Sequence, residues 1–486
     1  MTTSRITRVL ATGAVAAALC GLTGTAAATT PPAGSAAPGT PGGADPLAGL
    51  PACDVTALDG AGGPVEITVW SSMKADLLNK TMDELTQAFN ASQTQVRANY
   101  VNQGGYEDTI PKFLDADQGS RPDVVQLPEY MVRSIIDLRT AVPVGACIKS
   151  AGFDTSPFIP STLAQYAAGG VQWSLPFNVS DPVLLYNKKL FAAAGLDPNT
   201  PPVTLEDVAA MSKTLVDSGA AKYGIAIDSN FDNGGGWFLE QWLAKLGQFY
   251  TDNDNGRSAR ATKVTFNTPE LAGVLTTLQT MVKDGTALDV GDNPSGADNL
   301  LAMADKDAPA AMTIATSASI GSVLTILKGG QFPHLTVDDV AVAPMPGPGS
   351  PGTLVGGASL WINDSGDPAR VAAAWKYLEF MTAAQQQATW AATTGYVALR
   401  ADATELEPLK TALADPRFTV AGKQLQDIPA VATSTGPVVG PLLEIRTAVA
   451  EGVAKILNGE DVTATLAEME SQANALITDY NERNPG

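Results

Sequence analysis

Residues that could carry covalent or metal chemistry are few in this chain. One histidine occurs among 486 residues, His334, in the turn-like stretch GGQFPHLTV. A Ser-His-Asp arrangement would have to use His334 itself, and a histidine-rich metal site is excluded. We interpret His334 as a solvated or capping residue, and we predict no metal site and no cofactor. Aspartate and glutamate are plentiful, so composition alone leaves open a glycoside hydrolase that uses paired carboxylates.

The N-terminus has the pattern of a secretory signal. Two arginines precede a short apolar stretch, and Ala26-Ala27-Ala28 offers a small-residue cleavage site. The stretch is too short to span a bilayer. We therefore predict a signal peptide at 1–28 and an exported, extracellular or cell-surface protein. Cys20 is an alternative site of lipid anchoring, although Leu19 directly before it fits that signal poorly.

Two cysteines, Cys53 and Cys147, remain once the signal segment is removed. A pair of cysteines in an exported chain favours a disulfide, and two thiols without further ligands do not make a zinc site. We predict a Cys53–Cys147 disulfide that ties the start of the folded domain to a later turn.

The charge balance argues against nucleic acid and anionic membranes as partners. The chain carries 50 acidic and 30 basic residues, a net charge of −20, and no run of lysines or arginines relieves it. We interpret the charge as a source of solubility. We also expect a monomer that binds a small polar ligand.

Strands and helices alternate along the chain after a Pro/Gly/Ala-rich tether predicted at 29–63. Alternating apolar residues predict a strand at 64–72, and helical spacing follows at 73–92; the same alternation recurs through residue 129. A second α/β region begins near residue 204, and the last ~120 residues are mostly helical. Strand–helix–strand units at this spacing indicate parallel sheets with crossover helices.

Three stretches share apolar flanks around a polar or glycine-rich centre: LPFNVSDPV at 175–183, AMTIATSAS at 311–319 and LVGGASLWI at 354–362. We interpret them as hinge-crossing segments of a two-lobed α/β protein, because three strand-like crossings lie between two α/β regions. Ligands bind preferentially at such interfaces, and a hinge lets the lobes close around them. The predicted first lobe is 64–177 plus 312–353, and the second is 178–311 plus 354–486.

The sequence of these segments resembles a known family, the extracellular solute-binding proteins of ABC importers, and the resemblance implies a two-lobed periplasmic-binding-protein-like fold with three hinge-crossing segments. The resemblance covers nearly all of 64–484 and rests on EITVWSSM, YNKKLFAAAGLD followed by PPVT, GGASLWI, TTGYVALR and EIRTAVAEGVAKILNG. The last three point to the branch that binds glycerol-3-phosphate and glycerophosphodiesters. Trp70-Ser71 departs from the Trp-His that is frequent there, and the loop DSNFDNGGGW is richer in glycine and acid than expected.

The resemblance implies a set of ligand-binding residues. Tyr106, a cleft tyrosine, and Glu129, an acceptor of ligand hydroxyls, come from the first lobe, and Trp237 is a stacking platform. The remaining implied residues line the crossings or complete a phosphate side: Asn178, Ser180, Ser317, Ser319, Gly357, Tyr396 and Arg446. A phosphate is bound well by a bidentate arginine, hydroxyl donors and exposed backbone N–H groups.

Each of these residues also has a purely structural interpretation. Trp237 and Tyr106 are alternatively core and turn aromatics, and Glu129 an acid favoured at a helix start. Ser317 and Ser319 are alternatively helix caps. Arg446, among apolar neighbours, is alternatively a salt-bridged core arginine, and Gly357 a bulge without a ligand.

We therefore expect a binding protein, not an enzyme, that delivers its ligand to an ABC permease. A glycerophosphodiester or glycerol-3-phosphate is the first expectation and an oligosaccharide the second. We also expect that Trp237→Ala or Arg446→Ala weakens binding without unfolding the protein.

Overall fold

A computed structural model describes residues 45–348, 353–428 and 432–485. The predicted signal peptide, and with it Cys20, and residues 29–44 of the predicted tether lie outside these ranges. From Pro46 onward the chain forms one compact unit. Its strands lie in two main sheets, and we call the elements packed around each sheet the first and the second lobe.

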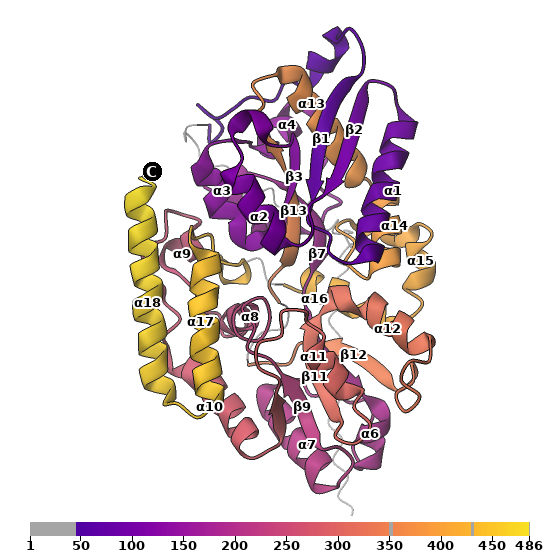
Figure 1. The fold of residues 1–486 in the computed structure, drawn as a ribbon, viewed down its shortest axis with the longest axis vertical. Helices are drawn as coiled ribbons and strands as arrows, with labels where there is room; N and C mark the ends of the chain where they lie inside the picture. Colours follow the sequence, from indigo (N-terminus) through magenta and orange to yellow (C-terminus); the bar gives the residue numbers. More distant parts are fainter. Residues whose placement is uncertain (1–44, 349–352, 429–431, 486) are drawn as a thin grey trace, which may run out of the picture. The chain divides into compact units, whose positions relative to one another are not determined.

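The first sheet has the strand order β2-β1-β3-β13-β4, and β7 also pairs with β13. β1 is parallel to β2 and β3, whereas β13 runs antiparallel to β3, β4 and β7. The strands are β1 Val65–Ser71, β2 Val96–Asn102, β3 Val124–Pro128, β4 Ala141–Val142, β7 Leu175–Ser180 and β13 Gly356–Asn363. Its helices are α1 Asp76–Ser92, α2 Tyr106–Asp115, α3 Val132–Leu138, α4 Val144–Ala151, α5 Pro160–Gln165, α13 Pro368–Met381 and α14 Ala384–Thr394. Figure 1 shows this group in the upper half of the picture, with α13 returning from late in the sequence to join early strands.

The second sheet has the order β10-β9-β11-β8-β12. Its strands are β8 Pro182–Asn187, β9 Tyr223–Ile227, β10 Ala287–Asp289, β11 Ala310–Thr316 and β12 Val340–Pro344. Helices of this half and of the C-terminal part are α6 Lys188–Ala193, α7 Leu205–Asp217, α8 Trp237–Lys245, α9 Asp252–Gly256, α10 Pro269–Lys283, α11 Asp298–Met303, α12 Ile320–Lys328, α15 Leu409–Ala412, α16 Val420–Gln426, α17 Leu442–Leu457 and α18 Val462–Arg483. The alternation expected from the sequence is thus present, and α17 and α18 pack side by side (Figure 1).

Shorter elements connect these parts. A two-stranded ribbon pairs β5 Ala167–Ala168 with β6 Val171–Gln172. Single turns of 3-10 helix are η1 Val55–Gly60, η2 Gln118–Ser120, η3 Glu129–Met131, η4 Ser317–Ser319, η5 Ala401–Glu405, η6 Pro416–Phe418 and η7 Ala432–Ser434.

The predicted division into lobes needs correction for two segments. β11 and β12, within 312–353, both pair with β8 in the second sheet, although the sequence interpretation gave this segment to the first lobe. β13, given to the second lobe, pairs with β3 and β7 in the first sheet. An apolar sequence with a polar centre indicates that a strand is buried, but it does not indicate which strand it pairs with. That pairing is determined by contacts distant in sequence.

Two of the three expected crossings do connect the sheets. The chain leaves the first sheet at the end of β7 and enters the second at β8, with Asp181 between them. It returns between β12 and β13. The stretch 311–319 does not cross, because η4 and α12 follow β11 and the chain comes back to the same sheet at β12.

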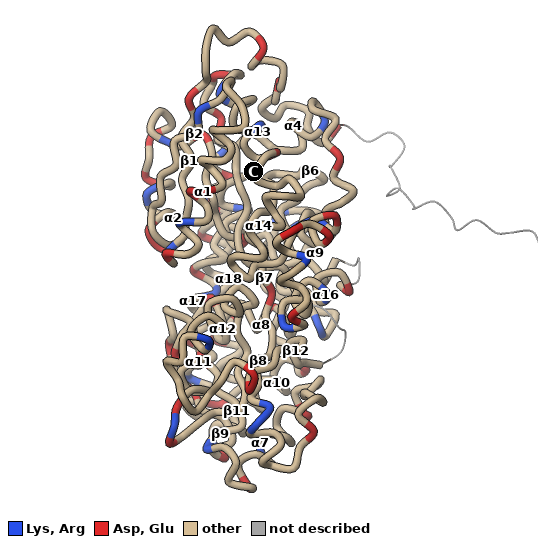
Figure 2. The backbone as a smooth tube through the Cα atoms, turned by 90° about the vertical axis from the view of Figure 1, so that its right-hand side faces the viewer, with Lys and Arg blue, Asp and Glu red and all other residues tan. Residues whose placement is uncertain are grey.

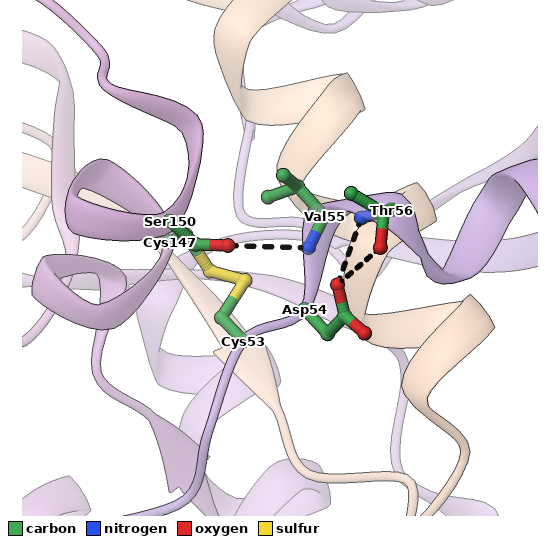
Figure 3. The surroundings of a disulfide bond; sticks show 6 residues. All are labelled: Cys53, Asp54, Val55, Thr56, Cys147 and Ser150. Atoms are coloured by element: carbon green, nitrogen blue, oxygen red, sulfur yellow. Dashed lines mark hydrogen bonds between the residues drawn. A yellow bond between two sulfur atoms is a disulfide. The ribbon is translucent and has the colours of Figure 1, made fainter.

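The predicted tether ends earlier than expected. Residues 46–63 belong to the compact unit, where η1 packs against α13 and Leu58 is buried. The Cys53–Cys147 disulfide is present, as predicted, and joins Cys53, which precedes the N-cap residue of η1, to α4 (Figure 3). Ser150 of α4 also accepts a hydrogen bond from the Val55 N–H.

Charged residues are spread over both lobes. Figure 2 shows short basic and acidic segments interspersed along the described chain, with no long basic run. Within the described ranges, no helix has the length and apolar character needed to cross a bilayer, and no cluster of three or more His, Cys, Asp or Glu side chains is arranged to hold a metal ion.

Candidate functional site

Two predicted site residues follow the carboxyl ends of neighbouring parallel strands. Tyr106 begins α2 after β2, and Glu129 begins η3 directly after β3. In open α/β sheets, ligands bind in the crevice outside these strand ends. Arg446, in the second turn of α17, reaches the same place from the C-terminal part of the chain: its Nη1 lies 3.0 Å from Glu129 Oε1. Glu129 and Arg446, both among the residues that the resemblance implies, are therefore in contact in the structure.

Arg446 is surrounded by carboxylates. Its Nε and Nη2 donate to the two oxygens of Glu240, at 2.6 and 2.9 Å. Asp232 Oδ1 is 3.8 Å from Nη1, and the guanidinium lies over the Tyr130 ring, 5.2 Å from its centroid. Arg446 and Glu240 are 1% and 2% exposed, so this is a buried ion pair and the salt-bridge interpretation of Arg446 applies.

The electrostatics of this cluster are acidic. Burial raises the pKa of the Glu129 carboxyl to about 7, although the Arg446 guanidinium acts in the opposite direction. Burial would lower the pKa of Arg446, but the carboxylates of Glu240 and Glu129 raise it well above its usual value. Asp232 exposes 46% of its side chain, so it faces solvent beside the buried pair. One guanidinium therefore balances three carboxyl groups, of which Glu129 is poised to take up a proton near neutral pH.

A second polar group connects the first lobe to the β7 crossing. Asn178, fully buried in β7, donates from Nδ2 to the Tyr106 hydroxyl at 3.2 Å and accepts from Gln126 Nε2 at 2.6 Å. The partly exposed Tyr396 stacks on Trp390. Burial raises the pKa of its phenol, and an interaction with the Asn178 side chain partly offsets that rise. Tyr106, Asn178 and Tyr396 are thus brought together as the resemblance implies.

Trp237 and the two central glycines of LVGGASLWI explain one another. A Cβ at Gly356 would lie 2.1 Å from the six-membered ring of the Trp237 indole, so the ring packs directly on the Gly356 backbone. Gly357 has φ +92°, and a Cβ there would lie 2.0 Å from the Asn178 carbonyl oxygen. Protein atoms therefore account for both glycines. Trp237 is 5% exposed, and its Nε1 has no hydrogen-bond partner among the residues that the structure describes.

The predicted serines have different surroundings. Ser317 is buried and its hydroxyl accepts from the Asp181 N–H at 3.1 Å, while the partly exposed Ser319 donates to the Thr316 carbonyl. Neither hydroxyl caps α12, so the capping alternative does not apply. Ser180, also buried, lies opposite Gly356 in the β7–β13 pairing.

Asp181 is an important residue that sequence reasoning missed. It is the single residue between β7 and β8, and it is fully buried. Its Oδ2 accepts from Thr353 Oγ1 at 3.0 Å and Gln424 Nε2 at 3.1 Å, while its backbone bonds Ser317. One aspartate therefore links both sheet crossings to η4 and α16. The sequence signal was available: an acid in the middle of an apolar crossing must find partners when buried.

We expect Asp181 to make stability depend on pH. Burial raises the pKa of its carboxyl from 3.8 to about 8, which the bonds from Thr353, Ser317 and Gln424 only partly offset. The folded protein therefore holds this proton more tightly than the unfolded chain between pH 4 and 8, and the group's stabilisation is lost as pH rises through that window. Asp181→Asn does not titrate, so its free energy of unfolding should rise relative to wild type, by up to about 1.4 kcal/mol per pH unit.

Urea unfolding at pH 5, 6.5 and 8 measures this difference. Burial lowers the pKa of Lys245 to about 8, although Asp181 acts in the opposite direction. Above pH 8 the titration of this lysine makes the free energy of unfolding rise with pH, so pH 8 is the upper limit of the comparison. A constant difference between the variant and wild type across the three pH values would show that Asp181 is ionised throughout.

This fold and site define a two-lobed solute-binding protein. The chain belongs to the family of bacterial extracellular solute-binding proteins, whose profile matches residues 84–419. It is similar to the sn-glycerol-3-phosphate-binding periplasmic protein UgpB of Salmonella typhimurium, with 30% identity over 405 residues that cover 81% of this chain and 88% of that protein. The UgpB of Pectobacterium atrosepticum is 29% identical over 89% of this chain and 96% of its own.

Solved structures show the same fold. The cyclic alpha-maltosyl-1,6-maltose binding protein of Arthrobacter globiformis has a TM-score of 0.70, 22% identity, and covers 86% of this chain and 100% of its own. UgpB of Mycobacterium tuberculosis, in complex with glycerophosphocholine, has a TM-score of 0.68 with the same identity and coverage. The family comprises binding proteins of ABC transporters, so this protein is a binding protein and not an enzyme.

Proposed function

We propose that this protein binds a glycerophosphodiester in the cleft between its lobes and delivers it to an ABC permease. The observation that carries the proposal is the Glu129–Arg446 contact, which joins the first lobe to α17 beside the hydroxyls of Tyr106 and Tyr396. Carboxylate, guanidinium and phenol together match the vicinal hydroxyls and phosphate oxygens of such a ligand. The UgpB relatives, named for glycerol-3-phosphate, support the same ligand class.

The hydrogen bonds of Arg446 limit how a phosphate would be bound. Nε and one N–H of Nη2 donate to Glu240, whereas Nη1 makes no hydrogen bond among the described residues, although it lies 3.0 Å from Glu129 Oε1. We therefore assign Nη1 as the guanidinium nitrogen that faces the ligand. In the proposed complex Glu129 accepts hydrogen bonds from the glycerol hydroxyls, Arg446 Nη1 donates to them, and the phenol hydroxyls of Tyr106 and Tyr396 donate to the phosphate.

The acidic surroundings favour a diester over a monoester. Glu129, Glu240 and Asp232 outnumber Arg446, and a doubly charged monoester adds more repulsion than a singly charged or zwitterionic diester. We therefore expect glycerophosphocholine to bind at least tenfold more tightly than sn-glycerol-3-phosphate, a difference of about 1.4 kcal/mol. Isothermal titration calorimetry at pH 7.5, with maltose and trehalose in the same panel, measures it.

An oligosaccharide is the second candidate, and the same acidic cluster supports it. Neutral hydroxyls donate to carboxylates without charge repulsion, and a known structural relative binds a cyclic maltosyl-maltose. Heat of binding with the sugars alone would overturn the glycerophosphodiester proposal, whereas tighter binding of the monoester than of the diester would overturn the charge argument. Recovery of unchanged ligand after incubation checks that no turnover accompanies binding.

A further inference from the structure

The loop DSNFDNGGGW, at 228–237, connects β9 to α8 and has a well-defined hydrogen-bond pattern. Asp228 Oδ1 accepts from the backbone N–H groups of Asn230 and Gly234, at 3.1 and 3.0 Å. Asn230 Oδ1 in turn accepts from the Asp232 N–H at 2.9 Å. These bonds hold the backbone of Asp232 in place, so the acidic residues that are unexpected in this loop have separate tasks.

A glycine of this loop brings it onto the helix that carries Arg446. A Cβ at Gly235 would lie 2.0 Å from the Ser229 carbonyl oxygen and 2.8 Å from the Ala450 Cβ, so only glycine fits there. Ala450 lies four residues after Arg446 on α17, and residues at this spacing share one face of a helix. The loop therefore packs on the face of α17 from which Arg446 projects.

The side chain of Asp232 lies beside the one guanidinium nitrogen that Glu240 leaves free. Glu240 accepts from Nε and Nη2 of Arg446, and the guanidinium lies over the Tyr130 ring, so the position of Nη1 is fixed. Asp232 Oδ1 is 3.8 Å from Nη1, and 46% of the Asp232 side chain is exposed. Nη1 is buried and makes no hydrogen bond in the part of the chain that the structure describes. A buried donor of this kind favours a ligand atom that can accept from it.

The spacing of these atoms suits a hydroxyl group. At 3.8 Å, Asp232 Oδ1 is too far from Nη1 for a direct hydrogen bond, which spans about 2.7–3.2 Å. A hydroxyl next to both atoms can accept from Nη1 and donate to the carboxylate at once. Glu129 Oε1 lies 3.0 Å from the same nitrogen. Two carboxylates beside one donor therefore match two neighbouring hydroxyls, with one hydroxyl for each carboxylate.

We propose that Asp232 is a further ligand-binding residue and that, together with Glu129, it selects ligands that carry a vicinal diol. The glycerol end of a glycerophosphodiester has such a diol, and so has a sugar ring. The inference thus rests on the proposed function for the location of the site, but not for the identity of the ligand. Asp232 follows β9 in the second lobe and Glu129 follows β3 in the first, so the diol connects the two lobes.

Calorimetry of Asp232→Ala with glycerophosphocholine tests this inference. Loss of the charged acceptor should weaken binding about tenfold, and Asp232→Asn, which keeps an amide oxygen, should lose less. Partial burial raises the pKa of the Asp232 carboxyl to about 6, although the Arg446 guanidinium acts in the opposite direction, so pH 7.5 keeps the group ionised. Two analogues of glycerophosphocholine, each lacking one hydroxyl of the diol, complete the test. For one of them, Asp232→Ala should bind as well as wild type, because the hydroxyl that Asp232 accepts from is already missing.

A structural or purely repulsive role of Asp232 would give different results. The backbone N–H of this residue remains in Asp232→Ala, so the melting temperature should not fall; a fall with unchanged affinity would show a structural role. If the carboxylate only repelled the phosphate, its removal would strengthen binding. The matched control is Glu444→Ala, which removes an exposed carboxylate of α17 two residues before Arg446 and should leave affinity unchanged.

The choice of ligands separates this inference from the proposed function. If wild type binds maltose and not glycerophosphocholine, the proposed function fails, and Asp232→Ala should then bind maltose about tenfold more weakly than wild type does. Equal affinity of Asp232→Ala and wild type for the ligand that binds would overturn the role of Asp232 alone. If wild type binds neither ligand, the site takes no diol, and both proposals are overturned.

Discussion

Replacing Arg446 with alanine should lower the free energy of unfolding by about 3–5 kcal/mol, the range typical when one partner of a buried ion pair is removed. The side chain is 1% exposed, and its loss leaves the buried carboxylates of Glu240 and Glu129 without their cation. The sequence alone suggested a loss of binding without unfolding. The buried pair changes that expectation, because the arginine also stabilises the fold.

Urea denaturation at pH 7.5 measures this effect, with two comparison variants. Arg483→Ala removes an exposed ion pair with Asp479, and such pairs contribute about 0–1 kcal/mol. Arg446→Ala combined with Glu240→Gln should recover part of the loss, since an amide carries no charge in the buried site. If Arg446→Ala is no more destabilising than Arg483→Ala, the cluster does not stabilise the fold and Arg446 is present for the ligand alone.

Local patterns in the sequence were sufficient to predict the elements. Alternation and helical spacing are short-range signals, and the parallel arrangement followed from the strand–helix–strand order. Tyr106 and Glu129 were proposed from the family resemblance, and the structure places each after a strand of the parallel sheet, where such residues meet at one sheet edge. The two-lobed fold was confirmed, and so was the disulfide.

Contacts distant in sequence determined what could not be predicted. The sheet membership of β11, β12 and β13 depends on pairing across more than 100 residues, as between β11 and β8. Glu240 was missed as the partner of Arg446, although each is a charged residue on the buried side of a helix that also carries many apolar residues. Buried charges require a partner, so two such residues in one chain are candidates for each other.

The glycines of LVGGASLWI show why a correct local signal led to an incomplete conclusion. Missing side chains did indicate close approach to the backbone, and the sequence interpretation assigned that approach to a ligand. Trp237 at Gly356 and the Asn178 carbonyl at Gly357 occupy the space in the protein itself. The approaching groups belong to the predicted site, so the crossing segments are packed against the residues that would contact a ligand.

Removing the disulfide should be the other large perturbation of this fold. Cys53 and Cys147 are 94 residues apart in sequence, and for a loop of that length the chain-entropy model assigns about 4–5 kcal/mol to the cross-link, with measured values of about 2–5 kcal/mol. The bond holds Cys53 on α4, where the Val55 N–H also donates to Ser150 Oγ (Figure 3). The double variant Cys53→Ala/Cys147→Ala should lose free energy of unfolding in this range.

Denaturation of wild type and the double variant, each with and without dithiothreitol, separates the bond from the substitutions. Reduction should lower the stability of wild type and leave the variant unchanged. The disulfide lies in the first lobe on α4, whereas the proposed ligand residues follow β2 and β3, so ligand affinity of the folded variant should match wild type. A change below about 1 kcal/mol would mean that the segment 46–63 is anchored by η1 and Leu58 alone and that the unfolded chain gains little freedom when the bond is broken.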